Sequence, residues 1–327
     1  MRIMLASLCV ACTLVTGVSR PNAQETCAPN TLGVARVAEV DTTGGPWFGM
    51  PHGDPDFLAP GEVVLTFDDG PHPRYTRPIL AALAAQCTKA TFFVVGEMVA
   101  EHPGIVKEMA DQGHTLGTHT WTHPNLRRLP DDKAQAQIES TFTAAEKAAG
   151  KPIAPFFRYP FLSDRDSIVT YLKSRNIGQF AIDIDSFDWR TRDARSIVHR
   201  VMSGLERRGR GIVLMHDIHA STMRAVPELL AQLKAKGYRI VHMRSRTTLQ
   251  VLVEFQPPVK DAKHTVSKAN PATTTRQRVR HRTVRARLVS LAGNYCPRAA
   301  SAAVARSRSR RAPTADDAAQ SGARSLS

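Results

Sequence analysis

The sequence predicts an α/β fold, a distorted barrel built from seven parallel strands. The first observation is a strict alternation of short apolar runs with amphipathic stretches between about Glu62 and Phe255. Such alternation implies a parallel sheet with right-handed crossovers. The second is the number of runs, because seven strands fit an incomplete or distorted barrel better than a complete one of eight. An open doubly wound sheet is the alternative. The strand candidates are Val63–Phe67, Ala90–Val95, Thr115–Thr118, Phe156–Arg158, Gly178–Ile182, Ile212–Met215 and Tyr238–His242.

Helix signals separate these apolar runs. The first helix is expected to begin at Thr76, whose side chain can act as the N-cap, with Pro78 in its first turn. A long helical stretch ends at Gly150, which is followed by Pro152. The expected helices are Thr76–Gln86, Asp131–Ala149, Asp164–Arg175, Asp193–Arg208 and Thr222–Lys236.

The first residues differ from ordinary globular sequence. Arg2 precedes an apolar stretch from Ile3 to Val18, and small and polar residues follow. This pattern is typical of a secretory signal peptide over residues 1–23, and the stretch is short for a membrane span. A retained N-terminal anchor is the alternative. We therefore expect an exported protein, periplasmic or secreted. Residues 24–61 are rich in Pro and Gly and are expected to wrap the outside of the barrel domain, which covers residues 62–255.

Most of the charge lies at the other end of the chain. Of the formal net charge of +15, twelve come from Pro258–Ser327, which holds 15 Lys or Arg and 3 Asp. Because this segment has few large apolar residues, it cannot bury enough surface to offset its ordering entropy. We expect residues 256–327 to form a disordered Arg-rich tail, which either contacts anionic wall or membrane polymers or has no function. The basic pI is therefore no argument for nucleic-acid binding, and no nucleic-acid partner is expected.

The cysteines indicate one disulfide. Cys9 and Cys12 would leave with the signal peptide, and Cys296 lies in the tail. Cys27 and Cys87 remain, and in an oxidising compartment they could pair and pin the N-terminal segment to the barrel. Two unpaired thiols are the alternative.

Two short runs carry the candidate chemistry. Asp68 and Asp69 end an apolar strand candidate at a Gly-Pro turn, and His119 and His123 follow another strand candidate four residues apart. One carboxylate and two neutral imidazoles form a three-ligand set for zinc that leaves a position open for water, and cobalt or nickel would also be accepted. The second carboxylate could serve as a base. Either run alone is also typical of a turn, a cap or surface histidines, but both stand where an α/β barrel displays catalytic residues.

The motifs and their order resemble the polysaccharide deacetylases with the NodB homology domain, carbohydrate esterase family 4. The resemblance covers about Glu62 to Arg244 and implies a NodB-type distorted (β/α)7 barrel. It also implies metal-dependent removal of acetyl groups from N-acetylated sugars. The five matching motifs are Thr66-Phe67-Asp68-Asp69-Gly70-Pro71 with Thr76 beyond it, His119-Thr120-Trp121-Thr122-His123, Arg158-Tyr159-Pro160, Asp185-Ser186-Phe187-Asp188-Trp189 and Leu214-Met215-His216.

The resemblance implies a metal site and a base. The metal would be held by Asp69, His119 and His123, and Asp68 would be the general base. Arg158 would form a salt bridge with Asp68, orienting that carboxylate while further lowering its pKa.

It also implies an acid and a small pocket. His216 would be the general acid that protonates the departing amine, and Asp188 would keep its imidazolium populated and oriented. Trp189 and Leu214, with Tyr159, would line the pocket for the acetyl methyl group. Ordinary core packing is the alternative for these apolar side chains.

Two positions depart from the family pattern. The third motif commonly continues with an aromatic residue and a glycine, whereas Phe161 and Leu162 follow here. A backbone N–H of this loop is expected to help hold the oxyanion, so the change bears on its geometry. The fourth motif often opens with Trp where this chain has Ile182.

The expected function is hydrolysis of the acetamide of N-acetylated sugars in an envelope or exported glycan, peptidoglycan or chitin-like. The expected partner is that glycan, and the chain is expected to act as a monomer. Three alternatives remain open at this point. They are a metal-dependent amidase acting on a small non-sugar amide, a catalytically silent glycan-binding barrel, and a polyanion binder acting through the tail.

Overall fold

The computed structural model describes residues 27–28, 30–53, 57–252 and 255. The signal peptide predicted for residues 1–23 and the tail predicted for residues 256–327 lie outside these residues. In the part of the chain that is described, no helix is long and apolar enough to span a bilayer.

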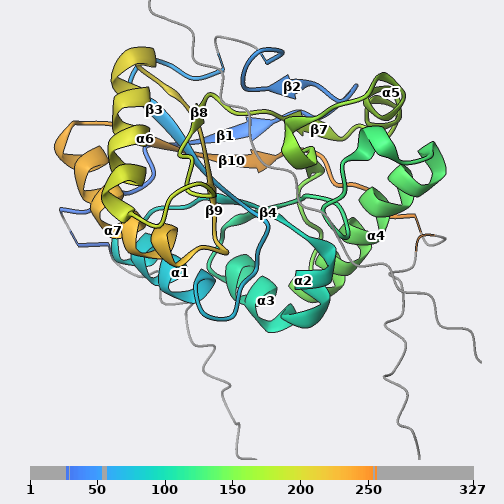
Figure 1. Cartoon of the computed structure of the whole chain (residues 1–327), viewed down its shortest axis with the longest axis horizontal. Helices are drawn as coiled ribbons and strands as arrows, with labels where there is room; N and C mark the ends of the chain where they lie inside the picture. Colours follow the sequence, from blue (N-terminus) through green and yellow to red (C-terminus); the bar gives the residue numbers. More distant parts are fainter. Residues whose placement is uncertain (1–26, 29, 54–56, 253–254, 256–327) are drawn as a thin grey trace, which may run out of the picture. The chain divides into compact units, whose positions relative to one another are not determined.

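One parallel sheet forms the centre of the fold, with helices around it (Figure 1). Its strands follow the order β1-β10-β3-β4-β5-β6-β7-β2, while β9 pairs with β3 and β8. The strands are β1 (Arg36–Val40), β2 (Trp47–Phe48), β3 (Glu62–Asp68), β4 (Thr91–Val94), β5 (Thr115–Thr118), β6 (Phe156–Phe157), β7 (Gly178–Phe180), β8 (Ile184–Asp185), β9 (Gly211–His216) and β10 (Arg239–Ser245).

The barrel is closed on one side and incomplete on the other. It closes between β3 and β9, which pair in register from Val63↔Gly211 to Asp68↔His216. On the opposite side β7 pairs with β6 and β2, whereas β8 pairs with β9, so among the described strands β7 and β8 are not joined. The predicted distorted seven-stranded barrel is therefore confirmed. The sequence reading missed β8 because a strand of two residues leaves no apolar run to recognise.

The helices agree with the expected ones where the apolar period is long. They are α1 (Thr76–Ala85), α2 (Gly96–Glu101), α3 (Pro103–Asp111), α4 (Asp131–Ala149), α5 (Asp166–Ser174), α6 (Ala194–Arg208) and α7 (Ala220–Ala235). The short helices α2 and α3 were not predicted. The predicted N-cap of α1 is wrong, because Tyr75 occupies that position without a side-chain cap. The hydroxyl of Thr76 instead accepts the N–H of His72 and donates to Asp217.

Alternation along β3 decides which side chains face the barrel interior. All seven of its residues are buried. Val63, Leu65 and Phe67 pack with the helices in the larger apolar cluster. Val64 packs in the second cluster, with Phe93, Phe156 and Phe180. Because side chains alternate along a strand, Thr66 and Asp68 lie on the same face as Val64. The interior is therefore apolar at its base and polar at the carboxyl end of β3.

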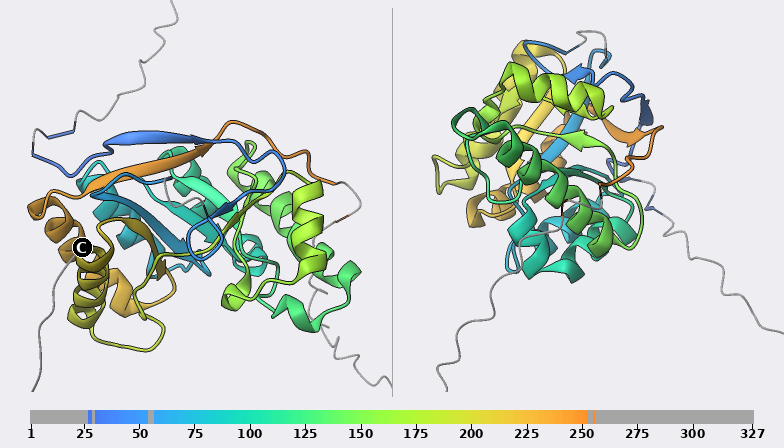
Figure 2. Two further views of the ribbon diagram at one scale, coloured as in Figure 1. Left: turned by 90° about the horizontal axis from the view of Figure 1, so that it is seen from above. Right: turned by 90° about the vertical axis from the view of Figure 1, so that its right-hand side faces the viewer.

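The N-terminal segment adds strands to two edges. β1 pairs with β10 from Arg36↔Val241 to Val40↔Ser245, and the two run side by side in Figure 2. β2 pairs with β7. The predicted disulfide is present, joining Cys27 to Cys87 at the end of α1 with a Cα–Cα distance of 5.9 Å. The segment is thus attached by backbone hydrogen bonds and by one covalent link.

Removing the disulfide should destabilise the fold. The link closes a loop between cysteines 60 residues apart. Cys87→Ser should lower the free energy of unfolding by about 2–4 kcal/mol, because the unfolded chain regains the entropy of that loop. Denaturant titration of the oxidised wild type and the variant measures the difference. The double variant Cys27→Ser/Cys87→Ser should be no less stable than Cys87→Ser, and two alkylatable thiols at these positions in the unreduced protein would contradict the link.

Candidate active site

The candidate side chains gather where three parallel strands end. Asp68 is the last residue of β3 and Asp69 follows it, His119 follows β5, and His216 ends β9. Because β3 lies between β4 and β9, and β5 follows β4 in the sheet, their carboxyl ends face one side of the barrel. Two sequence runs about 50 residues apart and a third near residue 216 therefore meet at one place.

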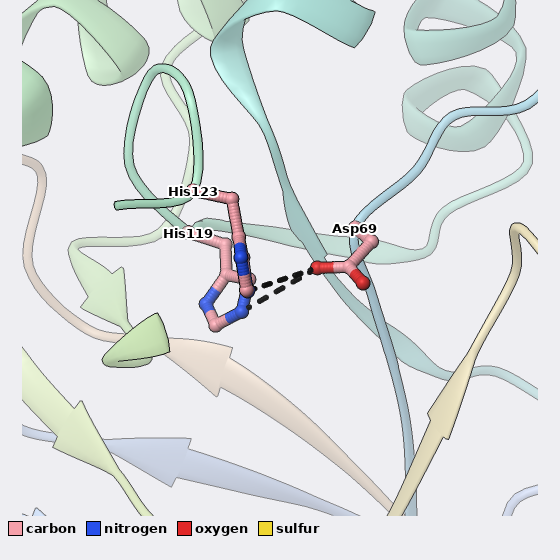
Figure 3. Close-up of side chains that lie close together, drawn as sticks. All are labelled: Asp69, His119 and His123. Atoms are coloured by element: carbon pink, nitrogen blue, oxygen red, sulfur yellow. Dashed lines mark ion pairs between the residues drawn. The ribbon is translucent and has the colours of Figure 1, made fainter. Parts of the chain in front are cut away.

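Asp69, His119 and His123 converge on a single point (Figure 3). One ligand atom from each lies within 4.8 Å of the others. Oδ1 of Asp69 is 3.6 Å from Nε2 of His119 and 3.4 Å from Nε2 of His123. This oxygen is buried and has no hydrogen-bond partner among the described residues. Two imidazole nitrogens aimed at an unsatisfied carboxylate oxygen fit a divalent cation between them.

The histidines are held in the form that binds a metal. Nδ1 of His119 lies 2.7 Å from the carbonyl oxygen of Arg158, and since a carbonyl only accepts, Nδ1 carries the proton and Nε2 is free to ligate. Burial lowers the pKa of His119 well below its usual value and lowers that of His123 as well. Asp69 and His123 have φ of 75° and 57°, a left-handed conformation that non-glycine residues seldom adopt. The backbone is strained at two of the three proposed ligands, as is common at functional sites.

Asp68 lies behind this cluster in a buried ion pair with Arg158. Nη1 of Arg158 donates to Oδ1 of Asp68 at 2.7 Å, and both side chains are almost fully buried. The guanidinium also donates to Thr66 Oγ1 and to the carbonyl oxygens of Phe180 and Ala181. Burial raises the pKa of Asp68 to about 6, although the charge of Arg158 opposes that rise. Arg158 lowers this pKa, as expected, but the loss of water on burial outweighs that effect.

His216 and Asp188 form a second pair next to Asp68, since Asp68 and His216 are register partners on β3 and β9. Nδ1 of His216 donates to Oδ1 of Asp188 at 2.7 Å, and the backbone N–H of His216 donates to Oδ2. The hydroxyl of Thr222 donates to Oδ2 as well, at 2.6 Å. Burial lowers the pKa of His216, but the hydrogen bond and charge of Asp188, with the charges of Asp68 and Asp69, raise it to about 9. The imidazolium is therefore the dominant form near neutral pH.

These groups surround a pocket of about 420 Å³. Arg158 and Asp188 are not in its lining but contact Asp68 and His216, which are. Of the predicted apolar lining, Leu214 and Tyr159 are buried in the wall, and Trp189 stands at the rim with 48% of its surface exposed. The lining residues are Asp68, Asp69, His119, His123, Tyr159, Phe161, Leu162, Asp185, Trp189, Leu214 and His216.

Sequence reasoning did not place three of these residues in the lining. Phe161 and Leu162 are 66% and 41% exposed, and the Phe161 ring lies 4.8 Å from that of His123. Their φ values of 59° and 51° are both left-handed, so the loop keeps a backbone that suits glycine although Leu162 stands there. The departure from the family motif was the signal that could have assigned them to the pocket. Asp185 opens the fourth motif, but the resemblance implied no role for it.

Asp217 is a further buried acid that the sequence reading left without a role. Its carboxylate accepts from Thr76 Oγ1 and packs against the turn after Asp69. A Cβ on Gly70 would lie 2.2 Å from its oxygens, so only glycine fits this turn. Burial raises the pKa of Asp217 to about 7. The close contact between Gly70 and the Asp217 carboxylate fixes the backbone turn that follows Asp68 and Asp69.

Comparison with known proteins identifies relatives of this site and fold. The family model described as polysaccharide deacetylase matches residues 58–179. A peptidoglycan-N-acetylglucosamine deacetylase of Bacillus cereus is 32% identical over 184 residues, which cover 55% of this chain and 84% of that protein. A solved peptidoglycan deacetylase of Bdellovibrio bacteriovorus superposes with a TM-score of 0.60 at 34% identity, covering 67% of this chain and 61% of that one.

The aligned region covers about the whole barrel domain of this chain but only part of the length of some relatives. A peptidoglycan-N-acetylglucosamine deacetylase of Listeria monocytogenes is 34% identical over 179 residues, and the chain spans only 37% of that protein's length. The aligned part covers 55% of this chain, about the extent of the barrel domain. With most of a Bacillus cereus relative aligned at 32% identity, the chain belongs to the polysaccharide deacetylase family.

Proposed function

We propose that the chain hydrolyses the acetamide of N-acetylated sugars in an exported or envelope polysaccharide, peptidoglycan or a chitin-like glycan, and releases acetate. The observation that supports this most directly is the convergence of Asp69, His119 and His123 beside the buried Asp68, in a pocket that His216 also lines. Relatives named for peptidoglycan-N-acetylmuramic acid and for chitooligosaccharides also match the chain, at 35% and 26% identity. Both substrate classes present the same acetamide.

A divalent cation would be held by Asp69, His119 and His123. Zinc suits two imidazoles and one carboxylate, and cobalt or nickel would also fit. When bound, the ion would polarise the acetyl carbonyl and acidify water at the site. The hydrogen bond from Nδ1 of His119 to the backbone carbonyl oxygen of Arg158 orients the ring so that Nε2 faces the ligand position.

Asp68 would take the proton from the attacking water. Its Oδ1 is held by Arg158, which leaves Oδ2 directed toward the cluster, 3.9 Å from Nε2 of His119. With a pKa near 6, the carboxylate is ionised at neutral pH and still basic enough to accept a proton. Arg158 fixes its orientation and prevents it from rotating away.

His216 would give a proton to the departing nitrogen. Its Nδ1 is occupied by Asp188, so the other ring nitrogen is the one available to the pocket. The high pKa of His216 keeps its imidazole protonated until the proton is transferred to the leaving nitrogen. Leu214 and Tyr159, buried in the pocket wall, offer an apolar surface for the acetyl methyl group, and Trp189 covers the rim.

We also infer that the protein works outside the cytoplasm. The Cys27–Cys87 disulfide supports an oxidising compartment, and the polymers named for the relatives belong to the cell envelope or lie outside it. A signal peptide over residues 1–23 and a monomeric enzyme complete this proposal.

The direct test is acetate release from chitooligosaccharides and from peptidoglycan. Purified protein should release acetate after addition of zinc, cobalt or nickel, and chelation should abolish the release because three protein ligands alone do not activate water. Intact mass of the product counts the acetyl groups lost. Absence of acetate from every glycan, with metal bound, would overturn the proposal.

Two substitutions should separate metal binding from base catalysis. His123→Ala should lower zinc affinity by at least about 100-fold, because it removes one of three protein ligands. Asp68→Asn should keep stoichiometric zinc and lower kcat by about 10²–10⁴-fold, because only the base is lost. The variant should fold, since Arg158 keeps its bonds to Thr66, Phe180 and Ala181. Metal analysis and acetate release measure both, and the reverse pattern would exchange the roles assigned to Asp68 and Asp69.

The alkaline limb of the pH profile should report His216. The acid must be protonated, so kcat/KM should fall as pH rises through its pKa. Asp188→Asn removes the carboxylate that raises this pKa, and the alkaline limb should move to lower pH by about one pH unit or more. Asp132→Asn, an exposed change on α4, is the matched control and should leave the limb in place. An unchanged limb in Asp188→Asn would remove His216 from the role of acid.

A further inference from the structure

A basic groove lies along α6, next to the proposed catalytic pocket. On this helix Ser196, Arg200, Ser203 and Arg207 recur at helical spacing and share one face, which extends about 16 Å along the axis. The hollow beside them has a volume of about 570 Å³ and is also lined by Arg195. The two serines are short, so they leave open space between the guanidinium groups.

The arginines of this groove are available to a ligand. Arg195, Arg200 and Arg207 are exposed. Within the described part of the chain, none of the three is within ion-pair distance of a carboxylate. Neighbouring Arg208, by contrast, pairs with Asp183 at 3.3 Å and faces a different pocket.

The two carboxylates in the groove wall are held by the protein itself. Asp193 caps α6, accepting the backbone N–H groups of Arg195 and Ser196. Asp185 accepts the N–H of Phe187 at 2.7 Å. Part of the hydrogen-bonding capacity of each carboxylate is therefore taken up by backbone N–H groups. The three positive charges of the arginines also outnumber the two negative charges of Asp185 and Asp193.

The groove adjoins the pocket. Asp185 lines both hollows. Arg200 lies over the Phe187 ring at 5.2 Å, and Arg190 lies over both Phe187 and Trp189, at 5.7 and 4.3 Å. Trp189 stands at the rim of the pocket. A row of alternating guanidinium groups and aromatic rings therefore leads from the site of acetamide cleavage to α6.

We propose that this groove binds carboxylates carried by the glycan, so that the enzyme prefers an N-acetylated glycan with acidic substituents to a neutral one. The inference rests on the proposed deacetylase function, because it takes the sugar in the pocket as its starting point. Guanidinium groups match carboxylates in geometry and charge, and several exposed ones in a row attract a polyanion more than any one of them would. A lactyl ether on the sugar and a peptide attached to it are two sources of such carboxylates.

The test compares three tetrasaccharides on zinc-loaded enzyme. They are neutral chitotetraose, a peptidoglycan fragment with its peptides, and the same fragment after hydrolysis of the peptide amides, which frees the lactyl carboxylates. Arg200→Gln/Arg207→Gln should lower the ratio of kcat/KM for the carboxylated over the neutral glycan by about fivefold at low salt. High salt should shrink the wild-type preference, since exposed charges are screened. The lactyl carboxyl is an uncharged amide while the peptide is attached, so a loss with the peptide-free fragment alone assigns the groove to the lactyl carboxylate. A loss with the peptide-bearing fragment alone assigns it to the carboxylates of the peptide, and a loss with both shows that the groove accepts either source.

The matched control is Lys147→Gln/Lys173→Gln, which removes two exposed charges from the last turns of α4 and α5, away from α6 (Figure 1). It should keep the wild-type ratio. An unchanged ratio in Arg200→Gln/Arg207→Gln, or an equal loss in the control, overturns the inference. Calorimetric titration of the same glycans gives a second readout. If no glycan releases acetate, the proposed function fails, while weaker binding of the carboxylated fragments to Arg200→Gln/Arg207→Gln would still support the groove.

Discussion

The buried ion pair between Arg158 and Asp68 is the interaction on which the site depends. The guanidinium lies 4.2 Å from the centroid of the Phe93 ring, and its donors reach β3, the end of β7 and the residue that follows it. Four acceptors satisfy a cation with no exposed surface, so the cost of removing it from water is largely offset. The carbonyl oxygen of the same residue orients His119. One side chain and its backbone thus position the proposed base and a proposed ligand together.

The two proton-carrying pairs of the site are tuned in different ways. Asp68 is attracted by the cations Arg158 and His216, yet it is buried so deeply that its carboxyl group is easier to protonate than a free aspartate. His216 is also buried, but Asp188 and the nearby carboxylates more than offset the loss of water, and its pKa rises. The result is a carboxylate and an imidazolium that face the same pocket and are both in their working forms at neutral pH. Neither state follows from residue type alone.

Much of the fold could be predicted from sequence, because buried parallel strands and long amphipathic helices leave strong patterns. The central strands and α4, with bounds Asp131–Ala149, followed from apolar runs and from Gly150. Among the missed elements, the shortest strands are held by partners farther along the chain. β2 and β8 have two residues each and exist because β7 and β9 offer them hydrogen bonds. The cap predicted at Thr76 failed for a similar reason, since a buried acid from residue 217 takes its hydroxyl.

For the candidate site too, some features followed from the sequence and others did not. The motifs placed Asp69, His119 and His123 on the correct strand ends, where the structure brings them together. What the motifs could not supply was the environment. The pKa of Asp68, the exposure of Phe161 and the clash that keeps Gly70 a glycine all depend on neighbours that only folding provides.

The pairing of β1 with β10 has a consequence for how the chain acquires its structure. Beside this pair, the hydroxyls of Thr42 and Thr247 meet at 2.5 Å across a sequence separation of 205 residues. A chain that is made N-terminus first therefore presents β1 long before its partner exists. Until β10 arrives, the backbone groups of β1 remain unmatched and open to pairing with other chains. The segment that leaves the ribosome early is among the last to be completed, and truncations near residue 245 should harm the beginning of the domain as much as its end.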